Sequence, residues 1–138
     1  MKILVSGCLT GINCKYNGGN NYHEKLMEFL KGHEVITVCP EVLGGLPTPR
    51  VPSEIRDGKV VNAQGMDVDK EFHKGAKIAL KIALENKVDL AILQSRSPSC
   101  GVKQIYDGTF SKKLKDGQGV FAQMLMEKGI PVKDVEEL

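Results

Sequence analysis

Three short apolar runs that each lead into a cysteine constrain the fold of this chain more than any other feature. The runs are residues 3–5, 35–38 and 90–93, and they are followed by Cys8, Cys39 and Cys100. Runs this short, bounded by glycine, proline and polar residues, are typical of buried β-strands. Several of the segments between them have the three- and four-residue apolar spacing of helices. Strands that alternate with helices favour a mostly parallel sheet with helices on both faces.

This alternation also predicts where the cysteines lie. Crossover connections between parallel strands share one hand, so the carboxyl ends of the strands meet at one edge of the sheet. In open α/β sheets the ligand crevice lies outside that edge. We therefore expect Cys8, Cys39 and Cys100 to converge. The expected fold is a single-domain, three-layer α/β/α architecture with a Rossmann-like, mostly parallel sheet and small β-hairpin insertions.

The remaining elements follow from periodicity and turn residues. We expect helices from residue 21 or 22 to about 30, from 67 or 69 to 87, and around 117–128. Asp57-Gly58 and Asp107-Gly108 are typical of the tips of β-hairpins. Residues 131–136 are expected to contain a short fourth strand.

Composition narrows the function classes. With 138 residues and no linker, residues 1–138 are expected to form a single domain. The net charge of +2 gives no reason to expect direct nucleic-acid binding. No apolar run approaches the roughly 18 residues of a membrane span. Residues 4–8 resemble a lipoprotein cleavage site, but only seven residues precede Cys8. We interpret this cysteine as internal and expect a cytoplasmic protein, in which disulfides are rare.

Three converging thiols allow more than one interpretation. They could bind zinc or an iron–sulfur cluster, since both take thiolate ligands. Three protein ligands leave one coordination position open, as catalytic metal sites do. They could also be buried structural cysteines, or one of them could be a reactive nucleophile. The chain has no Cys-x-x-Cys pair, so spacing alone does not decide among these alternatives.

Other residues near the three cysteines are candidates for the same site. Cys14 lies in a glycine-rich loop and is a fourth ligand, a second reactive thiol or a loop-packing residue. Glu41 follows Cys39 closely and is either an acid or base for catalysis or a solvated loop carboxylate. Ser97 and Ser99 flank Pro98 and either close a turn or act in the site. No phosphate-binding or dinucleotide-binding motif is present, which argues against nucleotide hydrolysis and hydride transfer.

The chain contains three ordered motifs around its cysteines. They are Cys8-Leu9-x-Gly11-x-x-Cys14-Lys15-Tyr16-Asn17-Gly18, Cys39-Pro40-Glu41-x-x-Gly44-Gly45-Leu46-x-x-Pro49-Arg50 and Ser97-Pro98-Ser99-Cys100-Gly101. Together these motifs resemble the DUF523 family, which includes the thiouracil desulfurases. The resemblance covers essentially the whole chain. Family members often have Arg-Tyr-Asp-Gly where this chain has Lys15-Tyr16-Asn17-Gly18.

The resemblance implies a [4Fe–4S] cluster held by Cys8, Cys39 and Cys100, with one iron free for the sulfur of a substrate. It also implies assisting roles for Glu41 and Ser97. The expected activity is a non-redox desulfidation of a small thiolated pyrimidine base or nucleotide, in which C=S becomes C=O and sulfide leaves. The alternative is a zinc- or cluster-binding module in sulfur handling that has no turnover of its own.

Overall fold

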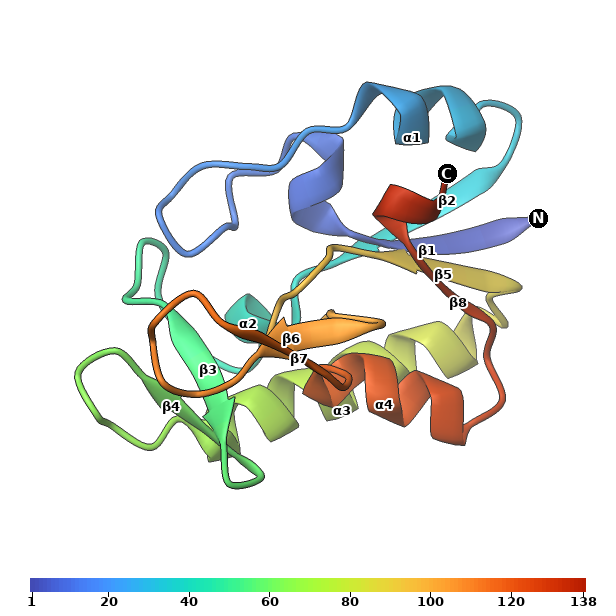
Figure 1. Ribbon diagram of the computed structural model, residues 1–138. Helices are drawn as coiled ribbons and strands as arrows, with labels where there is room; N and C mark the ends of the chain where they lie inside the picture. Colours follow the sequence, from blue (N-terminus) through green and yellow to red (C-terminus); the bar gives the residue numbers. More distant parts are fainter.

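The centre of the molecule is a four-stranded sheet in which all neighbouring strands are parallel. The computed structural model describes residues 1–138 and is drawn in Figure 1. The strands lie in the order β2-β1-β5-β8. They are β1 (Lys2–Ser6), β2 (Glu34–Val38), β5 (Leu90–Leu93) and β8 (Val132–Asp134). The three strands expected from the apolar runs and the short fourth strand are therefore confirmed.

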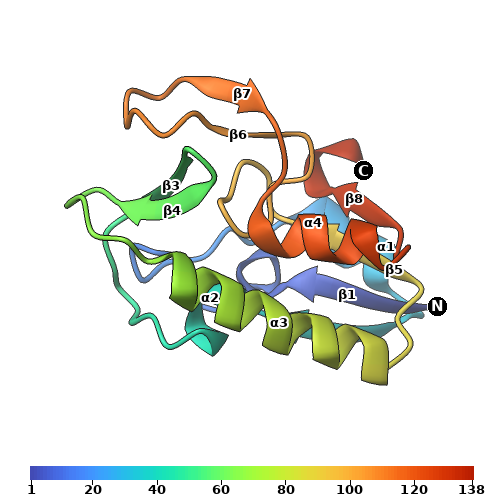
Figure 2. The same ribbon diagram turned by 90° about the horizontal axis from the view of Figure 1, so that it is seen from below.

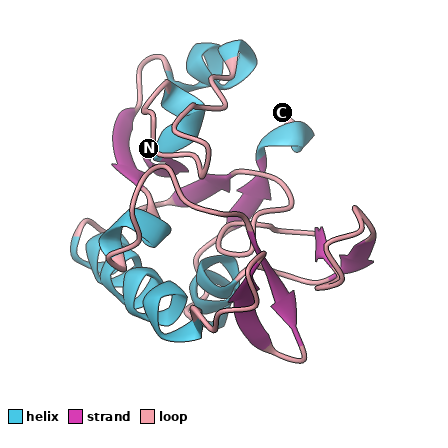
Figure 3. Ribbon diagram, turned by 90° about the vertical axis from the view of Figure 1, so that its left-hand side faces the viewer, coloured by secondary structure: helices cyan, strands magenta, loops and turns pink.

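Helices cover both faces of this sheet. α1 (Glu24–Leu30) lies on one face, and α3 (Asp69–Glu85) and α4 (Val120–Glu127) lie on the other (Figures 1 and 3). Alternate residues of a strand point to opposite faces, so β1 contributes to both cores. Ile3 and Val5 pack with Leu26 of α1, while Leu4 packs with the α3–α4 side. The expected α/β/α layering is confirmed.

The short helix α2 (Pro40–Leu43) is held against α3 by an unusually close backbone approach. A Cβ atom added to Gly75 of α3 would lie 1.7 Å from the carbonyl oxygen of Pro40. Only glycine permits this contact, because any side chain would occupy the space of the α2 backbone. Gly75 therefore sets the position of α2, which begins directly after Cys39.

Two β-hairpins lie beyond the carboxyl edge of the sheet, close to each other (Figure 2). The first consists of β3 (Ser53–Arg56) and β4 (Lys59–Asn62), with Asp57-Gly58 at its tip as expected. The second consists of β6 (Gln104–Tyr106) and β7 (Leu114–Asp116). The expectation that Asp107-Gly108 forms the tip of the second hairpin is wrong. These two residues begin a longer loop, 107–113. The side chain of Asp107 accepts a hydrogen bond from the amide of Thr109, and the amide of Asp107 donates to the carbonyl oxygen of Lys113, so no two-residue turn is closed.

Helix boundaries differ slightly from the expected ones. α1 begins at Glu24 and not at 21 or 22, because the ring of His23 accepts a hydrogen bond from the amide of Leu26 and caps the helix there. None of the helices has the length and apolar character that crossing a bilayer requires.

Candidate active site

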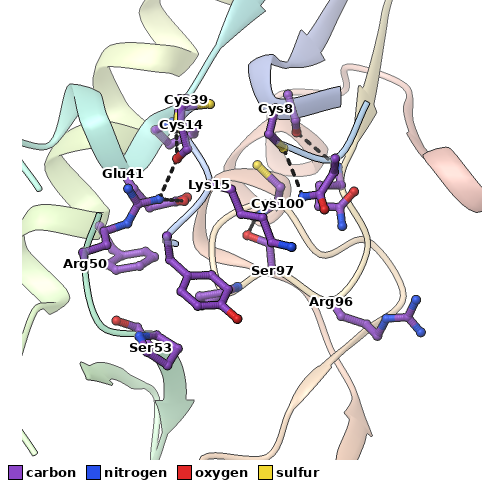
Figure 4. Close-up of a pocket in the computed structure, with 18 of the residues that line it drawn as sticks. Cys8, Cys14, Lys15, Cys39, Glu41, Arg50, Ser53, Arg96, Ser97 and Cys100 are labelled. Atoms are coloured by element: carbon purple, nitrogen blue, oxygen red, sulfur yellow. Dashed lines mark hydrogen bonds and ion pairs between the residues drawn. The ribbon is translucent and has the colours of Figure 1, made fainter. Parts of the chain in front are cut away.

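A cavity of about 510 Å³ opens at the carboxyl edge of the sheet. Its inner end is lined by all four cysteines of the chain, and none of them is in a disulfide (Figure 4). Two hairpins and the loop after β5 supply its outer walls. The predicted convergence of Cys8, Cys39 and Cys100 is therefore present in the structure.

Each of these three thiols reaches the cavity from the end of a different strand. Cys8 lies in the 3-10 turn Gly7–Thr10 after β1, and Cys39 is the N-cap residue of α2 after β2. Cys100 lies in the loop after β5 and is buried, whereas Cys8 and Cys39 are half-buried. Since β2, β1 and β5 are neighbours in the sheet, the sheet itself sets the separation of the three groups.

The surroundings divide the thiols into two electrostatic classes. A hydrogen bond from the Cys14 thiol, with a second from the Asn21 amide, lowers the pKa of Cys8 to about 7. The same Cys14 thiol lowers the pKa of Cys39. Burial raises the pKa of Cys100 well above its usual value. The lowered pKa values favour the thiolate form of Cys8 and Cys39, which is the form that binds metal. Burial favours the neutral thiol form of Cys100.

The arrangement of these thiols fits an iron–sulfur cluster. A cubane cluster takes each cysteine ligand at a separate iron corner. Cys8, Cys39 and Cys100 reach one cavity from three adjacent strand ends, so each can meet a different corner of one group. The three thiols around this cavity therefore fit a [4Fe–4S] cluster.

Cys14 belongs to this site as well, although its loop position suggested packing as the default. Its side chain is only 6% exposed, and it lines the cavity beside the ligand candidates. Its thiol can donate its one hydrogen to Cys8 or to Cys39, and these two neighbours raise the pKa of Cys14 itself. The Cys39 thiol in turn lies 3.6 Å from the carbonyl oxygen of Cys14. Cys14 is therefore placed as a hydrogen-bonding neighbour of two ligand candidates.

Glu41 points into the cavity from α2 and forms an ion pair with Arg50 (Figure 4). The Nη2 atom of Arg50 lies 2.8 Å from Oε2 of Glu41 and 3.0 Å from the carbonyl oxygen of Cys14. The two side chains are 8% and 15% exposed. Arg50 appears among the sequence-based expectations only as part of the second motif, and this pairing was not predicted, although that motif was the available signal for it. Arg50 donates to Oε2 of Glu41, and the other carboxylate oxygen, Oε1, is not part of this ion pair.

The two serines of the third motif have different positions. Ser97 lines the cavity, and its Oγ accepts hydrogen bonds from the amides of Ser99 and Cys100 at 3.1 and 3.0 Å. Ser99 is fully buried, and its hydroxyl has no hydrogen-bond partner. Of the two hydroxyls, that of Ser97 can meet a ligand in the cavity.

Comparisons with known proteins agree with these features. The model of a family described as 2-thiouracil desulfurase matches residues 3–137. The chain belongs to this 2-thiouracil desulfurase family. A solved structure, the [4Fe–4S]-dependent thiouracil desulfidase TudS, is similar with a TM-score of 0.93 and 38% sequence identity, over 99% of this chain and 92% of that one. The uncharacterized protein YbbK of Bacillus subtilis (strain 168) is 42% identical, over 99% of this chain and 97% of its own length. The resemblance expected from the three motifs is thereby confirmed.

In this member of the 2-thiouracil desulfurase family, cationic and aromatic side chains also line the cavity. Lys15 and Tyr16 belong to the first motif. Arg96, Tyr106, Phe110 and Lys112 lie outside the three motifs. Such a lining suits a flat, polar heterocycle held with its reacting end toward the cysteines.

Proposed function

We propose that this protein is a [4Fe–4S]-dependent, non-redox desulfidase that converts the C=S group of a thiouracil-type substrate to C=O and releases sulfide. Membership of the 2-thiouracil desulfurase family supports this function. The observation that carries it is the arrangement of three free thiols, from three adjacent strand ends, around one cavity that also contains Glu41 and Ser97.

Cys8, Cys39 and Cys100 would hold the cluster through one thiolate each. When bound, the cluster supplies a thiophilic iron with an open position, a Lewis acid toward a C=S sulfur. The side-chain amide of Asn21 donates a hydrogen bond from Nδ2 to the Cys8 sulfur at 3.5 Å. Hydrogen bonds to ligand sulfurs adjust the electronic properties of such clusters.

Glu41 is proposed to accept the proton of the attacking water. Arg50 engages Oε2 of this carboxylate and fixes its orientation, so Oε1 remains available toward the cavity. The ion pair is mostly shielded from solvent, which keeps the carboxylate from swinging away. A positioned base of this kind contributes about 10²- to 10⁴-fold to a rate.

Ser97 is proposed to donate its hydroxyl proton toward the substrate. Its oxygen already accepts two backbone hydrogen bonds, so the hydroxyl hydrogen is free to point into the cavity. The same two donors stabilise negative charge on that oxygen if the proton is passed on. We assign this role to Ser97 and not to Ser99, whose hydroxyl is buried away from the cavity.

The reaction balances without electrons, because C=S and water become C=O and hydrogen sulfide. The cavity volume of about 510 Å³ falls within the range of roughly 300–1,000 Å³ of small-molecule sites, so we propose a thiolated base or its nucleotide as substrate. We further propose that residues 1–138 act as one domain. Four free cysteines suit the reducing cytoplasm, which we propose as the place of action.

Anaerobic reconstitution tests this function. The reconstituted protein is expected to convert 2-thiouracil to uracil, measured by chromatography, with one sulfide released per uracil and no reductant added. Glu41→Gln keeps the size and loses the base, so it should retain the cluster spectrum and lose about 10²- to 10⁴-fold in rate. Glu85→Gln, at the exposed end of α3, is the matched control and should behave like the parent.

Two results would overturn the proposal. A reconstituted protein with an intact cluster that releases no sulfide from thiolated bases, nucleosides or nucleotides would leave a binding module without turnover. A Glu41→Gln protein with near-parent turnover would remove Glu41 from the reaction.

A further inference from the structure

The loop 107–113 of the second hairpin forms part of the outer cavity wall. Phe110 and Lys112 of this loop line the cavity, as does Tyr106 at the end of β6. None of these residues lies in the three cysteine motifs, and the loop begins six residues after Gly101, the last residue of the third motif. The wall that meets the substrate is thus supplied by a segment that has no part in holding the thiols.

The backbone of this loop is held in a conformation that its residues do not prefer. Phe110 has φ 56° and Lys112 has φ 63°, both in the left-handed region. A bulky residue there is uncommon and persists only where the surroundings over-determine it. Something outside the loop must therefore stabilise this conformation.

The carboxylate of Glu54 on β3 supplies that stabilisation. Its Oε1 accepts hydrogen bonds from the amide of Gly108 at 3.0 Å and from the amide of Phe110 at 3.1 Å. Hydrogen bonds to a charged acceptor are among the stronger ones in proteins. Because Oε1 accepts two backbone hydrogen bonds, Glu54 is suited to hold the loop.

Arg56, two residues farther along the same strand, completes the contact. Its Nε donates to the carbonyl oxygen of Gly108 at 2.8 Å, and its guanidinium lies 5.7 Å from the centroid of the Phe110 ring. A Cβ atom at Gly108 would lie 2.7 Å from the carbonyl oxygen of Ile55, so the approach of loop to strand requires glycine. Glu54 therefore holds the loop backbone at Phe110, and Arg56 lies against the Phe110 ring.

We propose that Phe110 is a substrate-contact residue on which the flat pyrimidine packs, and that Glu54 is the positioning residue that holds Phe110 in place. This inference rests on the proposed function, since it assumes a pyrimidine substrate. An aromatic ring at a cavity wall binds a base through its face, whatever the substituents of that base. Phe110 and Glu54 then control substrate binding, while the cysteine end of the cavity controls the chemistry.

Four variants of the anaerobically reconstituted protein test this inference. Phe110→Ala and Glu54→Ala should each raise KM for 2-thiouracil about 5- to 100-fold, the range expected for a lost base–aromatic contact, with kcat changed less than about threefold. Phe110→Tyr keeps the ring, and Glu54→Gln keeps a carbonyl acceptor for both amides. These two conservative variants should stay near the parent KM.

Two readouts do not depend on turnover. Amide hydrogen exchange of residues 107–113 should rise in Glu54→Ala and stay near the parent in Glu54→Gln. The Kd of the product uracil, measured by calorimetry, should rise in Phe110→Ala in parallel with KM. Asp69→Ala is the matched control, because Asp69 also accepts a strand amide, that of Val60, but does not line the cavity. It should leave KM, uracil binding and exchange in 107–113 unchanged.

The outcomes separate this inference from the function on which it rests. An active parent whose KM and uracil affinity are unchanged in Phe110→Ala would overturn the contact role, even if Glu54→Ala fails to fold. A rise in KM without increased exchange in Glu54→Ala would overturn the positioning role of Glu54. A parent that binds uracil through Phe110 but releases no sulfide would contradict the proposed reaction and leave this inference standing. A parent that does neither would overturn both.

Discussion

Cys8 and Cys100 present the same functional group in opposite electrostatic settings. Cys8 receives hydrogen bonds from Cys14 and Asn21, while Cys100 is enclosed by protein and loses hydration when it ionises. The proposed cluster would need both as thiolates, so its bond to Cys100 would have to offset the cost of ionising that thiol. Of the proposed ligands, Cys8 is ionised at the lower pH, because its pKa is about 7 while that of Cys100 is raised.

This difference predicts a pH dependence of thiol reactivity in the protein freed of iron. The rate of Cys8 alkylation by iodoacetamide should rise as pH increases through about 7, well below the ordinary value of 9.0, and then level off. Cys100 should remain slow throughout, because its pKa is raised. Peptide mass spectrometry after timed quenching gives both rates.

The lowered pKa of Cys8 also makes the free energy of unfolding depend on pH. A depressed pKa in the folded state means that the Cys8 contribution is fully present above pH 9.0 and is lost as pH falls through about 7. Cys14→Ala removes the main donor and should move the alkylation midpoint of Cys8 upward. An unchanged midpoint in Cys14→Ala would show that Cys14 is not the donor.

Among the elements, the α2–α3 contact positions the site most directly. α2 carries Glu41 and begins after Cys39, and its place depends on the close approach at Gly75. In an exposed helix, Gly→Ala stabilises by about 1 kcal/mol. At Gly75 the added methyl group would overlap the Pro40 carbonyl. The cost of this overlap should exceed the gain in helix propensity, so the substitution should destabilise the protein.

We therefore predict that Gly75→Ala lowers the free energy of unfolding by about 1–3 kcal/mol, measured by urea denaturation. The matched control is Lys74→Ala, the exposed neighbour on the same helix, which should change stability by no more than about 0.5 kcal/mol. A Gly75→Ala protein that is more stable than the parent would contradict the packing argument.

At the scale of the whole molecule, the proposed cluster joins three strands. Its ligands follow β2, β1 and β5, which are neighbours in the sheet, so one group would tie together their carboxyl ends. A group that binds only the folded state stabilises it by mass action. The apolar packing of α1, α3 and α4 is independent of the cluster, and the protein without iron should still fold.

Removal of the cluster is accordingly predicted to lower Tm by several degrees without abolishing the cooperative transition, as followed by circular dichroism under anaerobic conditions. The holoprotein should contain about four iron and four sulfide per chain. Alanine at Cys8, Cys39 or Cys100 should abolish most of the iron, whereas Cys14→Ala should keep it. Loss of iron in Cys14→Ala equal to that in Cys8→Ala would make Cys14 a ligand.

The sequence by itself determined the architecture and the three strand-end thiols. Apolar runs before Cys8, Cys39 and Cys100 are local signals, and the geometry of parallel sheets converts them into one shared edge. The motifs around them were also sufficient to identify the family. Features that depend on neighbouring residues and on the regular geometry of a sheet follow from the sequence alone.

Only the tertiary structure decided which further side chains reach the site. Arg50 meets Glu41, Cys14 lies beside Cys8 and Cys39, and Glu54 holds the loop around Phe110 because separate segments pack together. It likewise separated Ser97 from Ser99, which differ in burial although both flank Pro98. The physical reason is that side-chain direction in loops, and hydrogen bonds between residues far apart in the chain, depend on packing of the whole molecule and leave no periodic pattern in the sequence.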